Sequence, residues 1–238
     1  LFDLQETDID SEVVAFFDLD RTLISGYSIT VLMMELIRSG QMTFREFVTY
    51  SLGFLEYGLG RRDYNELLEL VSLRMRGRED IELMEIGRRA FDRKLEGMIY
   101  QQARILVEAH RLLGHRLVML TSATKYQAFP IADALSIPDV ECTQLDTENG
   151  ILTGKYLPCF GKGKLEAAWK YLEEHNGNQV RGRLLGKAYF YTDSEDDLAL
   201  LELCGYPVAI NPKPSLATEA RKRGWPQIEF ERIPYIAA

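Results

Sequence analysis

Two carboxylates with a spacing suited to chemistry, Asp18 and Asp20, stand directly after the apolar run Val13–Phe17. Residues i and i+2 of an extended chain point to the same side, so these two side chains are expected to lie together. Carboxylates so close repel each other unless a cation lies between them. The pair therefore indicates a metal site or an acid–base pair, whereas a strand that ends in a surface Asx turn is the plainer alternative.

A second acidic group, Asp193–Asp197, follows the apolar run Ala188–Tyr191. Ser194 as a helix N-cap, with Asp197 as the third residue after it, would form a capping box and would account for Asp197. It would not explain why four of the five residues are acidic directly behind a buried strand. A Mg²⁺ ion, which takes oxygen ligands, would account for both acidic groups together.

An ammonium group and a hydroxyl are available to hold a phosphate. Lys162 and Lys164 precede the amphipathic segment Leu165–His175 in a Gly-rich stretch, and Ser122 follows the apolar run Leu117–Leu120. Cations are disfavoured at a helix N-terminus, where anions bind well, so a substrate phosphate would reconcile the lysines with this position. Two solvated lysines in a loop are the alternative for this segment taken alone.

Short apolar runs that alternate with helices must position these groups. The runs expected as buried strands are Val13–Phe17, Leu117–Leu120, Ala188–Tyr191 and Pro207–Ile210. Strands that alternate with helices form a mostly parallel, Rossmann-like α/β sheet with helices on both faces. Ligands of such sheets bind beyond the carboxyl ends of the strands, which is where the polar groups stand. A hairpin is expected between Cys142 and Leu157, with its turn at Glu148–Gly150.

The segment between the first two strands is too long for a simple crossover. It covers roughly 90 residues and is helical in pattern over Ser28–Leu113. Its expected breaks are Ser39–Gly40, Gly58–Gly60, Gly77 and Gly97. We therefore expect an inserted all-helical cap over residues 27–101, and a discontinuous α/β core over 1–26 and 102–238. Core packing is expected for the aromatic stretch Phe44–Tyr57, with a lining of the substrate site as the alternative.

Composition narrows the classes of partner and compartment. The formal net charge of −8 argues against nucleic acid or an anionic membrane as the main partner. The longest uncharged run, Thr22–Met34, is too short to span a bilayer, and the acidic start Leu1–Glu12 does not have the pattern of a signal peptide. Three cysteines far apart form neither a metal-ligand spacing nor a disulfide framework, so a cytoplasmic protein is expected. The sequence indicates no particular oligomeric state.

The order of these groups along the chain resembles the haloacid dehalogenase-like superfamily of phosphohydrolases. The closer resemblance is to its phosphoserine-phosphatase-like branch, the subfamily IB hydrolases. The matching stretches are Phe16–Leu23, Leu120–Thr124, Cys159–Lys164, Tyr191–Asp197, Val208–Pro212 and Gly224–Pro226. The resemblance covers the core, and it implies a Mg²⁺-dependent phosphatase that acts on a small-molecule phosphomonoester through an aspartyl-phosphate.

The resemblance also implies a role for each acidic position. Asp18 would be the nucleophile and a Mg²⁺ ligand. Asp20 would protonate the leaving alcohol as a general acid and then activate water as a base, while its backbone carbonyl binds the metal. Asp193 would be the remaining protein ligand of the metal. Asp197 would support Asp193 as a further member of the metal-binding residues.

The other matching positions would face the substrate. Ser122 and Lys164 would hold the phosphate oxygens, and Thr22, Ala123 and Tyr27 are expected to line the substrate site. Strict phosphoserine phosphatases carry a Glu nine residues beyond the nucleophile, where this chain has Tyr27. Free phosphoserine is therefore expected to be a poorer substrate than a less cationic, larger phosphomonoester.

Several activities share this set of groups. The alternatives are a phosphoserine phosphatase proper and a phosphotransferase, in which an alcohol takes the phosphoryl group. An alternative of another class is a phospho-signalling receiver, which binds a partner and need not turn over. Asp20 and the large cap favour an enzyme over a receiver. A catalytically dead scaffold is disfavoured because no catalytic position of the motifs is substituted.

Overall fold

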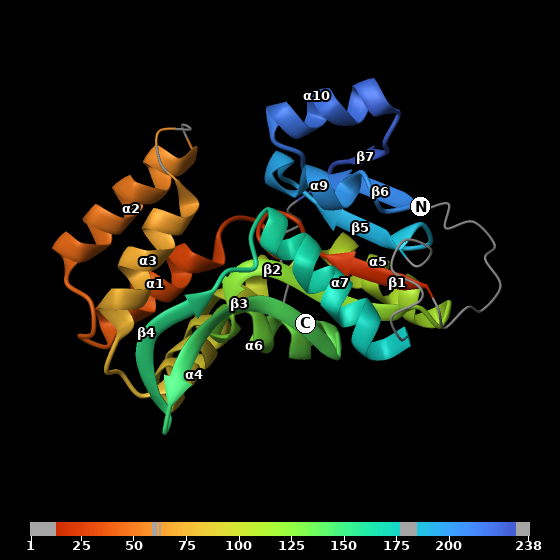
Figure 1. Cartoon of the computed structure of the whole chain (residues 1–238). Coiled ribbons are helices and arrows are strands. Elements are labelled where there is room, and N and C mark those ends of the chain that lie inside the picture. Colours follow the sequence, from red (N-terminus) through yellow and green to blue (C-terminus); the bar gives the residue numbers. More distant parts are fainter. Residues whose placement is uncertain (1–12, 59–60, 62, 177–184, 232–238) are drawn as a thin grey trace.

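The computed structural model describes residues 13–58, 61, 63–176 and 185–231. The acidic start Leu1–Glu12 and part of the break expected at Gly58–Gly60 lie outside the described residues. In the described part, seven strands form a sheet with the order β4-β3-β2-β1-β5-β6-β7 (Figure 1). The strands are β1 (Val14–Phe17), β2 (Arg116–Thr124), β3 (Asp139–Glu148), β4 (Ile151–Leu157), β5 (Tyr189–Thr192), β6 (Tyr206–Ile210) and β7 (Gln227–Ile228).

The strand order reverses beside β1. Every neighbouring pair of strands runs parallel except β3 and β4, which are antiparallel. From β1 the chain adds β2 and β3 on one side and β5 to β7 on the other, so the order reverses between β1 and β5. Such a reversal is the topological switch point at which doubly wound sheets bind ligands. The predicted Rossmann-like α/β fold is confirmed.

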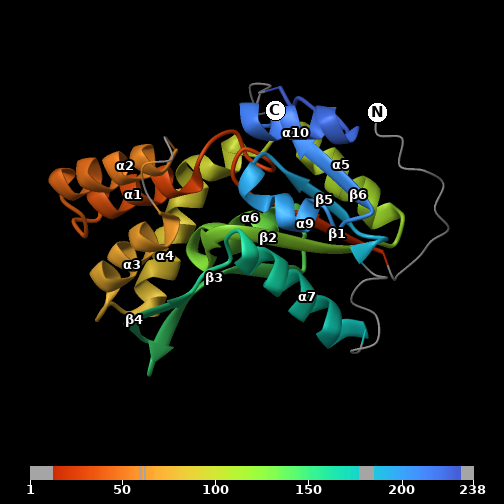
Figure 2. The same ribbon diagram turned by 45° about the horizontal axis from the view of Figure 1, so that its top comes forward.

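Alternate side chains of β1 face two helical layers. Ala15 and Phe17 belong to one apolar cluster, with α5 (Gln101–Leu112) and α6 (Lys125–Leu135). Val14 and Phe16 belong to another, with α7 (Lys162–Asn176), α9 (Leu198–Leu201) and α10 (Pro214–Arg223). The sheet runs between these layers (Figure 2), so β1 is apolar at every position. The 3₁₀ turn η3 (Glu195–Asp197) directly precedes α9.

Strand β2 is longer than its apolar run, whereas the hairpin of β3 and β4 lies where the sequence predicts it. The strand expected at Leu117–Leu120 is β2, which continues through Thr121–Thr124, and α6 begins directly after it. The pairing of β2 with β3 shifts register within this stretch, so the end of β2 is irregular. The expected hairpin is confirmed as β3 and β4. Its turn residues Asn149 and Gly150 have φ values of 52° and 79°, the left-handed conformation that a two-residue hairpin turn requires.

The chain between β1 and β2 is largely helical, and its first four helices lie beyond the carboxyl ends of the strands, on the left in Figure 1. We call its first four helices the helical insert: α1 (Ser28–Arg38), α2 (Phe44–Gly58), α3 (Tyr64–Met75) and α4 (Asp80–Ala90). A π-helical turn, η1 (Phe91–Leu95), and a 3₁₀ turn, η2 (Glu96–Met98), lead to α5. The breaks expected at Ser39–Gly40 and Gly77 separate helices, whereas Gly97 lies within η2. None of the described helices is long and apolar enough to cross a membrane.

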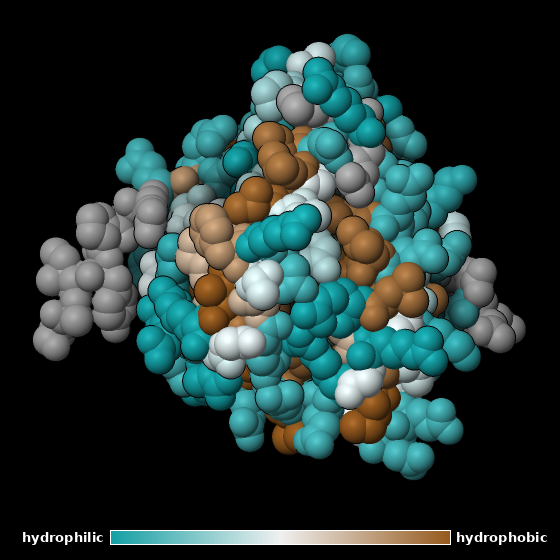
Figure 3. All heavy atoms as spheres, turned by 90° about the vertical axis from the view of Figure 1, so that its left-hand side faces the viewer, coloured by the Kyte–Doolittle hydropathy of each residue, from teal (hydrophilic) through white to brown (hydrophobic). Residues whose placement is uncertain are grey.

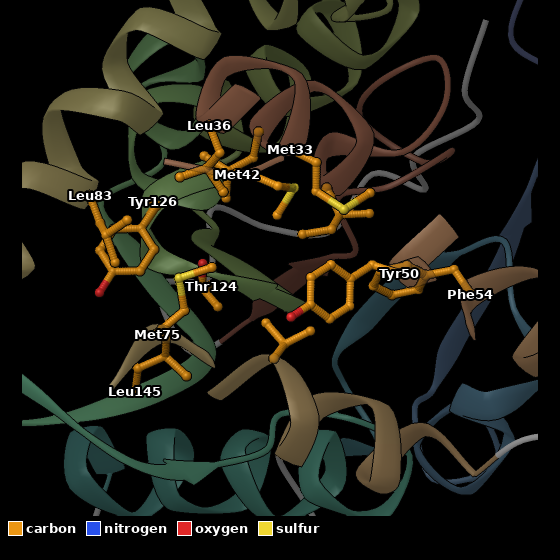
Figure 4. Close-up of a pocket in the computed structure, with 13 residues that line it drawn as sticks. Met33, Leu36, Met42, Tyr50, Phe54, Met75, Leu83, Thr124, Tyr126 and Leu145 are labelled. Atoms are coloured by element: carbon orange, nitrogen blue, oxygen red, sulfur yellow. The ribbon is translucent and has the colours of Figure 1, made fainter. Parts of the chain in front are cut away.

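The helical insert shares an apolar cluster with the core, because buried residues of α1 to α4 belong to the same cluster as those of α5 and α6. A cavity of about 40 Å³ is lined there mainly by apolar side chains, among them Met33, Met42 and Tyr50 (Figure 4). Among the described residues that line it, none is a site residue predicted from the sequence. Tyr50 is buried whereas Phe44 is 71% exposed, so the stretch Phe44–Tyr57 is core packing only in part.

The outer side of α2 is apolar as well. Phe44, Val48, Leu52 and Leu55 are exposed and recur at helical spacing along α2. Figure 3 faces this side of the molecule, where brown apolar patches alternate with teal polar ones. Helix α2 is thus apolar on two sides, of which the inner one packs within the insert.

Candidate active site

Asp18 and Lys164 meet at the switch point of the sheet. Asp18 directly follows β1, and its N–H donates to the carbonyl oxygen of Tyr191 at 2.9 Å, which extends the pairing of β1 with β5. Lys164 Nζ donates to Asp18 Oδ1 at 2.7 Å and to Asp197 Oδ2 at 2.9 Å. The three charged side chains are buried. One cation and two carboxylates from separate segments therefore form a buried ionic cluster.

Two glycines allow Lys164 to reach this cluster. Gly161 has a φ of +53°, in the left-handed region that favours glycine. A Cβ on Gly163 would stand 2.5 Å from the carbonyl oxygen of Pro158, closer than a side chain can fit. The sequence suggested that both lysines precede a helix. Helix α7 begins at Lys162 instead, so both lysines lie in its first turn. Lys162 is exposed, as a solvated lysine would be, but Lys164 is only 3% exposed.

Burial changes the protonation behaviour of the ionic cluster. Burial alone would lower the pKa of Lys164, but the charges of Asp18 and Asp197 outweigh it and raise that pKa above its usual value. The lysine is therefore a fixed positive charge. Burial raises the pKa of Asp18 more than Lys164 lowers it, and the carboxylates of Asp197 and Asp193 raise it further. Asp18 thus lies among surplus negative charge that a bound cation would offset.

Asp20 lies against the start of the helical insert. Its Oδ1 accepts a hydrogen bond at 2.7 Å from the N–H of Ser28, the first residue of α1. The residue is partly exposed, but the atoms packed around its carboxyl group desolvate it and raise the pKa of Asp20 to about 6, against the effect of this hydrogen bond. A carboxyl group with a pKa near neutrality can both give and take a proton at ordinary pH.

Asp193 is held by a residue of the segment that follows β1. Arg21 Nε donates to Asp193 Oδ2 at 2.7 Å, and its Nη2 donates to the carbonyl oxygen of Asn211 at 3.0 Å. Asn211 Nδ2 donates in return to the carbonyl oxygen of Arg21 at 3.0 Å. Burial raises the pKa of Asp193, while Lys213 and Arg21 oppose the rise. The loops after β1, β5 and β6 are therefore joined by one set of hydrogen bonds.

Asp197 does not complete the capping box considered from the sequence. Ser194 caps η3 as expected, because its hydroxyl accepts from the N–H of Asp196. The carboxylate of Asp197 instead accepts from Lys164, and from the hydroxyl of Thr192 at 2.6 Å. The explanation of Asp197 as a helix cap is wrong, since its partner is the buried lysine.

The donor chemistry at this edge fits Mg²⁺. Among the described residues, no three Asp, Glu, His or Cys side chains converge closely enough to hold a metal ion as they stand. Asp18 and Asp193 are nevertheless buried carboxylates at adjacent strand ends, close enough for the charge of Asp193 to act on Asp18. Carboxylate and carbonyl oxygens are the protein ligands that Mg²⁺ takes, and a cation would relieve this repulsion.

The other predicted site residues lie at different depths around the cluster. Thr22 is buried, and its Oγ1 has no hydrogen-bond partner within the described structure. Ser122 and Ala123 lie near the end of β2, and Ala123 is buried. Tyr27 directly precedes α1 and is 48% exposed, which makes it the one exposed member of the predicted site.

Comparison with known proteins agrees with this geometry. Residues 15–202 match the family model of the haloacid dehalogenase-like hydrolases. The chain belongs to this family. The family predicted from the motifs is therefore confirmed, and with it the prediction of an enzyme.

Several relatives of this hydrolase carry the names of phosphatases. The chain is 32% identical over 225 residues to a histidinol-phosphatase of Neisseria meningitidis, covering 92% of this chain and 99% of that protein. It is 29% identical over 229 residues to a phosphoserine phosphatase of Mycobacterium tuberculosis, covering 93% of this chain and 72% of that protein.

Solved structures of the same fold include two with high coverage. A Bordetella pertussis protein of unknown function superposes with a TM-score of 0.81 and 25% identity, covering 94% of this chain and all of that one (100%). A substrate-bound phosphoserine phosphatase superposes with a TM-score of 0.64 and 17% identity, covering 92% of this chain and 93% of the other. The second likeness shows the fold alone.

Sequence motifs did not reveal every residue at the site of this hydrolase. Tyr57 and Tyr64 come from the helical insert; Tyr57 ends the aromatic stretch for which a lining of the substrate site was the alternative, whereas no motif marked Tyr64. Phe160 and Arg21 stand inside stretches that match the family, but no spacing rule pointed to their contacts. Arg21 also has a left-handed φ of 61°, which the sequence does not indicate.

Proposed function

We propose that the enzyme is a Mg²⁺-dependent phosphomonoester hydrolase that acts through an aspartyl-phosphate on Asp18. The observation that carries this proposal is the buried contact of Asp18 with Lys164 at the switch point, with Asp20 two residues away. A carboxylate cannot approach a phosphate dianion unaided, and Lys164 supplies a fixed positive charge where the two negative charges would meet. Two carboxyl groups with different surroundings provide separate roles of nucleophile and acid–base catalyst.

The chemistry has two steps at these residues. An Asp18 oxygen attacks phosphorus while the bond from phosphorus to the ester oxygen breaks, and Asp20 gives its proton to the departing alkoxide. Water then attacks the aspartyl-phosphate, Asp20 takes a proton from that water, and phosphate leaves with Asp18 restored. Dividing the hydrolysis in this way replaces one difficult step with two easier ones. Ser122 and Lys164 would hold the phosphate oxygens in both steps.

Mg²⁺ would be held by Asp18, Asp193 and the backbone carbonyl of Asp20. It would supply positive charge that neutralises and orients the phosphoryl group. Arg21 would keep the Asp193 carboxylate in place through its 2.7 Å hydrogen bond. We assign Asp197 to the support of Lys164 and not to direct metal ligation, because its Oδ2 already accepts from Lys164 and Thr192.

The helical insert is proposed to act as the cap, over residues 27–101, that selects the leaving group. It reaches the core at the site, since Tyr57 of α2 and Tyr64 of α3 contact core residues there. Histidinol phosphate heads the list of candidate substrates, because a relative of matching length carries the name histidinol-phosphatase. Phosphoserine is the second candidate by the same reasoning. Three buried free cysteines agree with a cytoplasmic location.

The proposal is tested by phosphate release from a panel of phosphomonoesters in Mg²⁺. The panel should contain histidinol phosphate, phosphoserine, and matched esters with cyclic and open-chain alcohols. We expect turnover of at least one ester by the wild type and none by Asp18→Asn. Added glycerol should leave the phosphate yield unchanged, and a glycerol phosphate product would indicate a phosphotransferase instead. Equal turnover by wild type and Asp18→Asn would refute the proposal.

A further inference from the structure

Three aromatic rings meet where the helical insert touches the core. Tyr64, the first residue of α3, stacks on Phe160 with a centroid distance of 4.1 Å and an interplanar angle of 25°. Tyr57 of α2 meets the same two rings edge-on, at 5.5 Å from Tyr64 and 5.9 Å from Phe160. Phe160 belongs to the core and stands four residues before Lys164. We call Tyr57, Tyr64 and Phe160 the aromatic cluster.

Two phenol groups of the aromatic cluster bind opposite sides of the site. Tyr57 Oη donates at 2.5 Å to Oδ2 of Asp196, which lies in η3 after β5. Tyr64 Oη donates to the backbone carbonyl oxygen of Ser122 at 3.2 Å, near the end of β2. The second distance is long for a hydroxyl donor, which prefers about 2.7–2.8 Å, so this bond is the weaker one and is readily exchanged for a better acceptor.

The phenol of Tyr64 also lies within electrostatic range of the catalytic groups. Burial raises the pKa of Tyr64 to about 12, the charge of Asp20 adds to that rise, and Lys164 opposes it. In an in-line displacement the leaving oxygen departs on the side opposite the nucleophile and next to the general acid. A residue of the insert that lies near Asp20 is therefore on the leaving-group side of the phosphate.

We propose that Tyr64 is the specificity-determining residue of this hydrolase, and that it selects leaving groups with a planar ring close to the ester oxygen. The face of its ring that is turned away from Phe160 offers a flat surface for the ring of the alcohol. Its hydroxyl, released from the Ser122 carbonyl, hydrogen-bonds the bound ester near Asp20 and holds the leaving oxygen toward that acid. The inference rests on the proposed phosphomonoester hydrolysis and adds the class of leaving group to it.

The test compares two esters whose alcohols are similarly basic, benzyl phosphate and ethyl phosphate. One aromatic contact contributes about 0.5–1.5 kcal/mol beyond area burial, which corresponds to a preference of up to about tenfold. We expect the wild type to prefer benzyl phosphate in kcat/KM, and Tyr64→Leu to lose that preference mainly through KM. Tyr64→Phe keeps the ring, so it should keep the preference and lose only part of kcat.

Tyr156→Phe is the matched control. Tyr156 Oη donates to the backbone carbonyl oxygen of Asn65 at 3.2 Å, so this variant also removes a phenol bond between α3 and the core. Its preference for benzyl phosphate should equal that of the wild type. Benzylphosphonate should inhibit the wild type more strongly than ethylphosphonate, and Tyr64→Leu should abolish the difference.

The outcomes separate this inference from the proposed function. A folded Tyr64→Leu enzyme that keeps the wild-type preference overturns the role of Tyr64 while phosphatase activity stands. A wild type that hydrolyses benzyl phosphate and ethyl phosphate with equal kcat/KM also overturns the role of Tyr64 while phosphatase activity stands. A wild type that hydrolyses no phosphomonoester of the panel overturns the proposed function and this inference with it.

Discussion

Lys164 Nζ lies 2.7 Å from Asp18 Oδ1, and both side chains are buried. The same ammonium group is 2.9 Å from Asp197 Oδ2, so one lysine serves two buried carboxylates. This sharing makes the lysine and the carboxylates of the ionic cluster unequal in their effect on stability. Removing the lysine leaves two carboxylates without their cation, whereas removing one carboxylate leaves the lysine paired.

Lys164→Met should therefore destabilise the protein far more than Asp18→Asn. Breaking a buried ion pair by removing one partner costs about 3–5 kcal/mol. We expect Lys164→Met to lower the free energy of unfolding by that amount in urea titrations with EDTA present, and Asp18→Asn to change it little. Equal free energies of unfolding for the two variants would contradict the shared pairing of Lys164.

Activity should depend on Mg²⁺ through Asp193. EDTA should stop phosphate release, Mg²⁺ should restore it, and Ca²⁺ should not, because Ca²⁺ takes more and longer oxygen contacts and would misplace the nucleophile. Asp193→Asn should raise the Mg²⁺ concentration needed for half-maximal activity. Asp92→Asn is the control, since Asp92 makes an exposed ion pair with Arg88 at 3.1 Å. Full activity in a preparation shown to be free of metal would rule out this dependence.

His110 should make stability fall as the pH falls. Its Nε2 lies 2.7 Å from Tyr191 Oη and its Nδ1 lies 2.7 Å from His115 Nδ1, and burial together with His115 lowers the pKa of His110 to about 3. Between about pH 6.5 and pH 3 the unfolded chain binds a proton here that the folded protein does not, so acid favours unfolding in this window. The stability that the neutral, buried His110 contributes is fully present above about pH 6.5.

His110→Gln removes that titration. Urea titrations at several pH values should show that the free energy of unfolding declines less steeply on acidification in His110→Gln than in the wild type, whatever the absolute loss from repacking. Identical slopes for the two proteins would mean that His110 is protonated in the folded state.

Close packing of α4 on α6 should make Gly87 intolerant of a side chain. A Cβ there would stand 2.1 Å from the carbonyl oxygen of Tyr126, which is backbone and cannot swing aside. We expect Gly87→Ala to lower the free energy of unfolding by about 1–3 kcal/mol. Gly97→Ala meets nothing within 4 Å and should be neutral or stabilising by up to about 1 kcal/mol. Thermal unfolding of both variants checks the contrast, which fails if Gly87→Ala is as stable as Gly97→Ala.

The position of the site could be predicted from the sequence because it depends on strand ends. Val14–Phe17 and Tyr189–Thr192 are apolar at nearly every position, and polar residues follow each run at once. Parallel strands bring their carboxyl ends to one edge, so Asp18 and Asp193 had to lie near each other. Lys164 stands in a Gly-rich stretch before a helix, and its place at the site was implied by the family resemblance and not by the strand ends.

The pairing within the site could not be predicted, because it depends on long-range geometry. Arg21 and Asp193 are 172 positions apart, and no local pattern couples them. Asp197 had a sufficient local explanation as a cap, and only the structure shows that Lys164 takes its carboxylate. Tyr64 lies in an insert whose helices pack by shape, so nothing in its own segment indicated a contact with Ser122.

The role of Asp18 as nucleophile is tested most directly by locating the phosphate on the protein. The enzyme is mixed briefly with Mg²⁺ and the ester of the panel that it hydrolyses fastest, then quenched in acid, reduced with borohydride and digested for mass spectrometry. Borohydride reduces an aspartyl-phosphate to homoserine, so we predict homoserine at position 18 in the wild type and none without the ester or in Asp18→Asn. Homoserine or a phosphate at another residue, or rapid turnover that leaves every residue unmodified, would contradict the account.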